Sequence, residues 1–116
     1  MNKIFYLSSC DTCKRIINEL ELKEKAFKFQ DIKTEKITIS QLEELKNKTG
    51  SYEALFSKIA RKYKELKLNE KKLTEEEMKN LILKEYTFLK RPVILINEKI
   101  FVGNSKKTIE EAKKAL

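Results

Sequence analysis

The stretch of sequence that decides the fold is Lys3-Ile-Phe-Tyr-Leu-Ser-Ser-Cys-Asp-Thr-Cys-Lys-Arg-Ile-Ile17. Its first residues, through Leu7, are apolar and β-prone, which predicts a buried strand ending at two serines. From Asp11 onward apolar residues recur at helical spacing, which predicts an amphipathic helix to about Lys23. Cys10 therefore falls between a strand and the start of a helix.

The elements that follow extend this beginning into an α/β fold. Residues 26–32 alternate apolar and polar side chains, which predicts a second strand and completes a right-handed βαβ unit. Three helical patterns follow at residues 40–50, 51–63 and 74–82. Capping-box patterns at Ser40-Gln-Leu-Glu43 and Thr74-Glu-Glu-Glu77 predict helix N-termini, and Gly50 predicts a helix C-terminus.

The C-terminal part reads as a hairpin and a last helix. Pro92 opens a β-branched strand at residues 93–96, and a tight turn leads to a second strand at residues 100–102. Ser105 caps the last predicted helix, in which Ile109, Ala112 and Leu116 face the sheet. We expect one domain over residues 1–116 with a mixed four-stranded sheet. Its core comprises residues 1–36 and 87–116, and residues 37–86 form an all-helical insertion.

The composition sets limits on function. Hydrophobic residues make up 41% of the 116 positions and charged residues 38%, which excludes disordered and disulfide-scaffold proteins. The net charge is +8, but the basic residues are spread along the chain. This predicts a solvated lysine-rich surface, and we do not expect direct nucleic-acid binding. No membrane segment or export signal is expected, so the predicted location is the cytoplasm.

Thiol chemistry is the function class that the residue inventory leaves open. The chain has no histidine, which excludes Ser-His-Asp and Cys-His catalysis. Its two cysteines, Cys10 and Cys13, are too few to close a zinc site, and we expect neither a metal nor a cofactor. A thiol at a helix N-terminus has a lowered pKa, and Lys14 adds positive charge nearby. We therefore expect Cys10 to be a nucleophile and Cys13, one helical turn on, to resolve its mixed disulfide.

Two structural interpretations remain open beside this one. Cys13 could simply be a small core residue on the apolar stripe, with Cys10 an incidental turn residue. Arg91-Pro92 could be an ordinary surface arginine and a proline that opens an edge strand.

Several short motifs, in order along essentially the whole chain, resemble the arsenate reductase (ArsC) and Spx family. They are Tyr6-Leu-Ser-Ser-Cys-Asp-Thr-Cys-Lys14, Leu55-Phe-Ser57, Lys90-Arg-Pro-Val-Ile94 and Val102-Gly-Asn104. The resemblance implies a thioredoxin-like three-layer fold with a helical insertion. It also implies a cis proline at Pro92 beside the active cysteine.

The resemblance also implies roles for individual residues. Cys10 matches the family's nucleophilic cysteine, and Arg91 matches its oxyanion-binding arginine. Two further anion-binding arginines of glutathione-dependent arsenate reductases would fall near Ser57 and Gly103, where this chain has none. Losing two guanidinium groups weakens oxyanion binding, so we do not expect efficient arsenate reduction.

These observations lead to one main functional hypothesis and two alternatives. The main hypothesis is an ArsC-like thiol-disulfide oxidoreductase that depends on glutathione, glutaredoxin or thioredoxin, with Lys14, Arg91 and Pro92 contacting the substrate. The first alternative is an Spx-like regulator that binds RNA polymerase and uses Cys10 and Cys13 to sense oxidation. The second is a family member without redox function.

Overall fold

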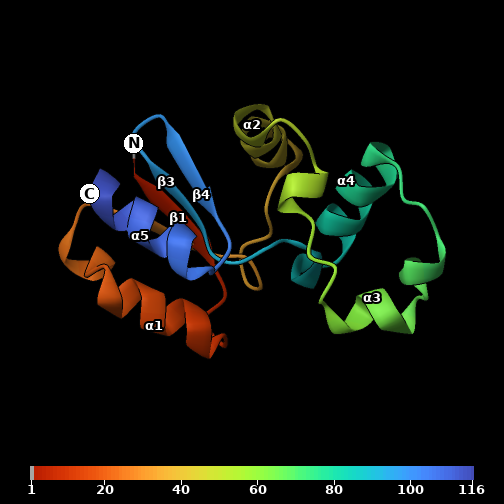
Figure 1. Cartoon of the computed structure of the whole chain (residues 1–116), viewed down its shortest axis with the longest axis horizontal. Coiled ribbons are helices and arrows are strands. Elements are labelled where there is room, and N and C mark those ends of the chain that lie inside the picture. The colour runs from red at the N-terminus through yellow and green to blue at the C-terminus, as the bar shows by residue number, and fades with distance from the viewer. Residues whose placement is uncertain (1) are drawn as a thin grey trace. The chain divides into compact units, whose positions relative to one another are not determined.

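The computed structural model describes residues 2–116, which form an α/β protein (Figure 1). Its strands and α-helices are, in chain order, β1 (Lys3–Tyr6), α1 (Asp11–Glu19), β2 (Lys28–Asp31), α2 (Ile39–Thr49), α3 (Arg61–Glu65), α4 (Glu75–Lys84), β3 (Val93–Ile96), β4 (Lys99–Val102) and α5 (Lys106–Ala115). Short 3₁₀ helices lie between them: η1 (Leu22–Glu24), η2 (Glu53–Leu55), η3 (Leu68–Glu70) and η4 (Tyr86–Phe88). Within residues 2–116, no helix has the length and apolarity needed to cross a membrane.

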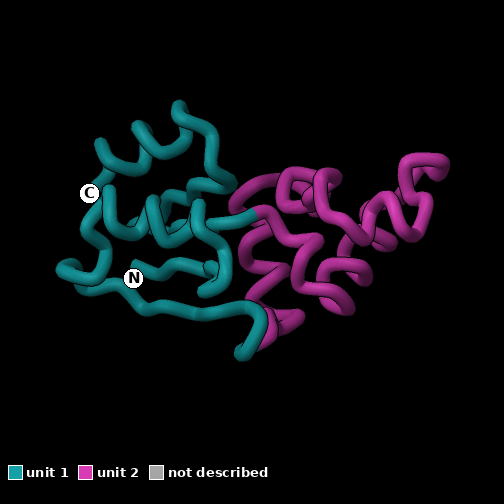
Figure 2. The backbone as a smooth tube through the Cα atoms, turned by 90° about the horizontal axis from the view of Figure 1, so that it is seen from below, with its two compact units in different colours: residues 1–35, 91–116 teal, residues 36–90 magenta. Residues whose placement is uncertain are grey.

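The chain divides into two compact units (Figure 2). Unit 1 comprises the residues up to Glu35 together with Arg91–Leu116, and unit 2 comprises Lys36–Lys90. Unit 1 contains all four strands with α1 and α5, while unit 2 is helical. Both predicted cysteines therefore lie in the unit that carries the sheet.

The four strands form one mixed sheet in the order β2-β1-β3-β4. β1 is parallel to β2, with Tyr6 opposite Asp31, and antiparallel to β3, with Phe5 opposite Val93. β3 and β4 form the predicted antiparallel hairpin, and Asn97 in its turn has a positive φ of 55°. The predicted α/β class with a mixed four-stranded sheet is confirmed.

Helices α1 and α5 pack on the same face of this sheet. Ile4 of β1 and Ile94 of β3 are fully buried in one cluster with Ile16 of α1 and Ile109 of α5. Burying one such side chain stabilises the fold by roughly 1.5 to 3 kcal/mol. This cluster fixes β1 and α1 against each other, and thereby the position of the turn that joins them.

Two predicted helix ends are wrong. α1 ends at Glu19, before Lys23, because the chain turns at Glu21 with a left-handed φ of 53°. Leu116 was predicted to face the sheet, but it follows the end of α5 and is 41% exposed. The cap of α5 is Ser105, as predicted.

The helices of unit 2 begin at capping boxes. At α4 the Thr74 hydroxyl accepts the Glu77 N–H, and the Glu77 carboxylate accepts the Thr74 N–H, as predicted. At α2 the prediction of a cap at Ser40 is wrong, because the cap is Thr38, whose partner is a glutamine three residues later. Gly50 ends α2 with a φ of 95°, a conformation that glycine adopts without steric cost.

The helix predicted over residues 51–63 does not form as one element. The chain instead makes η2, continues without helix, and starts α3 at Arg61. In one continuous helix Ile59 would share an apolar stripe with Leu55 and Phe56, but its side chain is 94% exposed.

An isolated bridge explains why this helix breaks. The Ser57 N–H donates to the Phe88 carbonyl at 2.7 Å, and the Lys90 N–H donates to the Leu55 carbonyl at 2.8 Å. Main-chain groups that a helix would use internally are therefore bonded to a distant segment of the chain. The Phe56 and Phe88 rings stack there, with centroids 5.2 Å apart.

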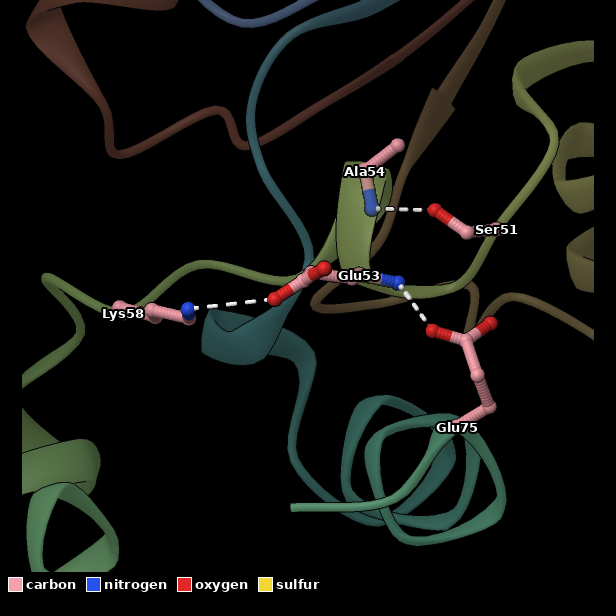
Figure 3. Close-up of polar contacts among 5 residues, drawn as sticks. All are labelled: Ser51, Glu53, Ala54, Lys58 and Glu75. Atoms are coloured by element: carbon pink, nitrogen blue, oxygen red, sulfur yellow. Dashed lines mark hydrogen bonds and ion pairs between the residues drawn. The ribbon is translucent and has the colours of Figure 1, made fainter. Parts of the chain in front are cut away.

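A carboxylate from α4 holds the start of η2 (Figure 3). The Glu75 side chain accepts the N–H of Tyr52 at 2.7 Å and the N–H of Glu53 at 3.1 Å. The Ser51 hydroxyl accepts the N–H of Ala54 at 3.1 Å. These N–H groups open a 3₁₀ helix and have no partner within it, so side chains satisfy them.

Replacing this carboxylate should weaken unit 2. We expect Glu75→Ala to lower the free energy of unfolding by roughly 1 kcal/mol, because two N–H groups lose an acceptor that is exposed to solvent. Glu76→Ala is the matched control, since it removes a charge from the same helical turn and should cost less than about 0.5 kcal/mol. Urea denaturation of the two variants measures the difference. Equal losses would contradict the assignment.

Candidate active site

Cys10 occupies the turn that joins β1 to α1. Its N–H donates to the Leu7 carbonyl at 3.0 Å, which closes a turn over two serines. Its backbone is extended, with φ −91° and ψ 113°, and its Sγ accepts the N–H of Cys13 at 3.4 Å. Cys10 is therefore the N-cap of α1, and its sulfur lies where the helix macrodipole favours negative charge.

Cys13 lies one helical turn further on. It is fully buried on the same stripe as Ile16, whereas Cys10 is partly exposed. Both thiols are free. The structure therefore brings the two predicted cysteines together, and only Cys10 is open to a partner from solution.

The surroundings of Cys10 favour its thiolate. Burial alone would raise the pKa of the Cys10 thiol. Hydrogen bonds from the main chain and side chain of Cys13, the positive charge of Arg91 and the N–H of Thr12 outweigh burial and lower that pKa below its ordinary value. A lowered pKa increases the share of the nucleophilic thiolate at neutral pH.

The surroundings of Cys13 have the opposite effect. Burial raises the pKa of the Cys13 thiol to about 12, against a hydrogen bond with the main chain of Leu7. The hydrogen bond with Cys10 and the negative charge on Cys10 add to the rise. Cys13 is therefore a protonated thiol when Cys10 is ionised.

Arg91 and Pro92 stand just before β3, and the peptide bond between them is cis. Pro92 is buried, and Arg91 is half-buried. The charge of Arg91 acts on both cysteines. The structure thus brings Arg91 within electrostatic range of the predicted nucleophile.

The other predicted positions lie as follows. Lys14 is in the first turn of α1, where its N–H donates to the Cys10 carbonyl at 3.1 Å and its side chain is exposed. Gly103 donates its N–H to the Pro92 carbonyl at 2.9 Å. Ser57 belongs to unit 2 and is buried. Contact of Lys14 with a substrate stays a prediction.

The sequence interpretation did not single out Asp31, at the end of β2. Its carboxylate accepts the side-chain and main-chain hydrogens of Ser8, two residues before Cys10. The signal that could have found it is topological, because the carboxyl ends of parallel β1 and β2 meet at one edge of the sheet.

Within residues 2–116, no three cysteine, aspartate or glutamate side chains lie close enough together to be potential metal ligands.

The opposite pKa directions predict selective alkylation. At neutral pH we expect iodoacetamide to modify Cys10 at least about a hundredfold faster than Cys13. As the pH rises, the Cys10 rate should level off at a pH below that for an ordinary cysteine, while Cys13 should react only as the pH approaches about 12. Peptide mass spectrometry measures both rates, and the urea-unfolded chain, in which the two thiols should react alike, is the control. Similar rates in the folded chain would refute this assignment.

Comparisons with known proteins agree with this architecture. The model of the ArsC family matches residues 5–112. Among curated proteins, none matches the chain significantly. Solved structures are similar over nearly their full length. The YFFB protein has a TM-score of 0.84 at 21% identity and covers 100% of this chain and 99% of its own.

Two further solved structures are similar. An arsenate reductase from Vibrio cholerae has a TM-score of 0.79 at 17% identity, over 99% of this chain and 97% of its own. SACOL0876 from Staphylococcus aureus COL has a TM-score of 0.76 at 27% identity, over 96% of this chain and 97% of its own.

The mixed sheet in the order β2-β1-β3-β4, with a cysteine at the start of α1 and a cis proline before β3, is a thioredoxin-like arrangement. Because the family model spans most of the sequence, this chain belongs to the ArsC family.

Proposed function

We propose that this chain is a thiol-disulfide oxidoreductase in which Cys10 is the nucleophile and Cys13 the resolving cysteine. The observation that carries the proposal is the Cys10 sulfur, partly exposed and bonded to the N–H of Cys13 at the start of α1. A thiolate so placed is stabilised without a histidine base.

The first step is attack by the Cys10 thiolate on one sulfur of a substrate disulfide. The substrate S–S bond breaks, a mixed disulfide forms at Cys10, and one substrate thiolate leaves and takes a proton from water. In the second step Cys13 gives its proton to water and attacks the Cys10 sulfur. The second substrate thiolate leaves and takes a proton from water, and the Cys10–Cys13 disulfide forms, so the substrate gains two electrons and the chain loses two. Glutathione, glutaredoxin or thioredoxin then returns the chain to the dithiol.

The charge on Cys10 sets the order of these steps. While Cys10 is a thiolate, its charge and hydrogen bond raise the pKa of Cys13. In the mixed disulfide that charge is gone, so the pKa of Cys13 falls at the stage where Cys13 must ionise.

The remaining predicted residues would serve substrate binding. Arg91 and Lys14 would supply positive charge for an anionic substrate such as oxidised glutathione, and Pro92 would contact the substrate next to Cys10. Arsenate should be a poor substrate, because compact oxyanions need several charge-assisted donors and no arginine stands at Ser57 or Gly103. We also propose a cytoplasmic location, where paired thiols stay reduced.

The test is reaction of the reduced chain with oxidised glutathione at neutral pH. We expect a mixed disulfide at Cys10, release of two glutathione thiols, and a reduction potential of about −270 to −200 mV for the pair. Failure of Cys10 to form the mixed disulfide would end the proposal.

The Spx-like alternative uses the same pair as a sensor. A pull-down from lysate with the reduced and the oxidised chain separates the two functions. Retention of RNA polymerase subunits in one redox state would favour the regulator, while turnover of disulfides without such retention favours the oxidoreductase.

A further inference from the structure

A carboxylate links the end of β2 to the turn that carries Cys10. Asp31 stands opposite Tyr6 at the last pair of the parallel β1–β2 ladder. Its side chain accepts the hydroxyl and the N–H of Ser8, and also the N–H of Lys33 at 3.1 Å. Asp31 therefore joins two connections that leave the same edge of the sheet.

The two serines of the turn bury little surface that could hold them in place. Ser8 and Ser9 are both exposed, and the main-chain bond that closes the turn runs from the Cys10 N–H to the Leu7 carbonyl. On the other side, the Ile32 N–H donates to the Tyr6 carbonyl at 2.9 Å, which fixes the base from which Asp31 reaches Ser8.

We propose that Asp31 is a positioning residue for Cys10: by holding Ser8, it keeps the Cys10 sulfur against the N-terminus of α1. This inference rests on the proposed function, because it assigns a second residue to the activation of the same thiolate. Asp31 does not touch the substrate in this scheme. It acts through the turn, which sets whether the Cys10 sulfur can accept the Cys13 N–H.

Charge and position make opposite predictions for Asp31. The groups that act on Cys10 are Cys13 and the N–H of Thr12 on α1 and Arg91 before β3, and Lys33 lies beside Asp31. If Asp31 acted on Cys10 only through its negative charge, which disfavours a thiolate, removing Asp31 would lower the pKa of Cys10. If Asp31 acts by supporting the turn, removing it weakens the hydrogen bond from the Cys13 N–H to the Cys10 sulfur and raises that pKa.

The experiment measures the pH profile of Cys10 alkylation by iodoacetamide in the full chain. In Asp31→Ala we expect the apparent pKa of Cys10 to rise by about half a unit, which slows alkylation about threefold below that pKa. Asp31→Asn keeps one acceptor oxygen and should restore most of the wild-type profile. Glu110→Ala, which removes an exposed carboxylate from α5, is the control and should leave the profile unchanged.

Ser8→Ala removes the hydroxyl donor from the other side of the contact and keeps the test decisive if Asp31→Ala fails to fold. It should raise the apparent pKa in the same direction by a smaller amount. An apparent pKa that is unchanged or lower in the folded variants overturns the positioning role. If wild-type Cys10 does not react with oxidised glutathione, the proposed function fails. If it reacts and the variant profiles match the wild type, only the role of Asp31 fails.

Discussion

Cys10→Ser will abolish the reaction of this chain with oxidised glutathione, with a rate loss of about a thousandfold or more. A hydroxyl at this position stays protonated at neutral pH and is a poor nucleophile toward sulfur. Cys13 does not substitute for it, because Cys13 is fully buried and this burial raises the pKa of its thiol. Stopped-flow or mass-spectrometric detection of the mixed disulfide measures the loss.

The matched control is Cys13→Ser. This variant keeps the attacking thiolate and loses the resolving thiol, so we expect it to form the mixed disulfide at Cys10 and to stop there. The accumulated adduct should contain one glutathione per chain. A Cys10→Ser chain that still forms an adduct, or a Cys13→Ser chain that forms none, would reverse or remove the assigned roles.

Phe88→Ala will cause the largest loss of stability in unit 2. Phe88 is fully buried and stacks on Phe56, at a bridge that joins two distant segments. Truncation leaves a cavity and removes the ring contact, for a loss of about 3 to 5 kcal/mol in the free energy of unfolding. Hydrogen exchange at the Ser57 and Lys90 amides, which close the bridge, reports the change locally.

Ile59→Ala is the control for this prediction. The Ile59 side chain is apolar but 94% exposed, so its removal should change the free energy of unfolding by less than about 0.5 kcal/mol. Comparable losses in the two variants would mean that Ile59 is buried in solution. That result would contradict the break in the helix between η2 and α3.

Elements with strong local signals could be predicted from the sequence. The β1–α1 turn follows from a β-prone run, two serines and a helical repeat. The α4 start follows from Thr74 and Glu77, because a capping box is made within one turn. The hairpin at Asn97 likewise depends on adjacent residues. These signals involve residues only a few positions apart, so no tertiary contact is needed to read them.

Features that depend on distant segments could not be predicted. Phe56 and Ile59 have helical spacing, but this segment forms main-chain hydrogen bonds with residues 88–90 in place of those of a helix. The alternation over residues 26–32 predicts that the polar Gln30 faces solvent. Its side chain is instead 1% exposed, and its amide donates to the Glu35 carbonyl at 3.1 Å. Asp31 belongs to the same class, since its partner Ser8 lies beyond a whole helix.

The strand order has a consequence for how the reactive thiol comes into being. β1 lies between β2 and β3 and pairs Lys3 with Leu95, so the sheet joins segments from opposite ends of the sequence. Contacts at such separation cost loop-closure entropy before they stabilise the fold, and they slow folding. Arg91, whose charge helps hold Cys10 ionised, arrives with the segment leading into β3. During synthesis on the ribosome, Cys10 therefore emerges early with its partners in α1, and the contribution of Arg91 to its thiolate is added only when the far end of the chain docks.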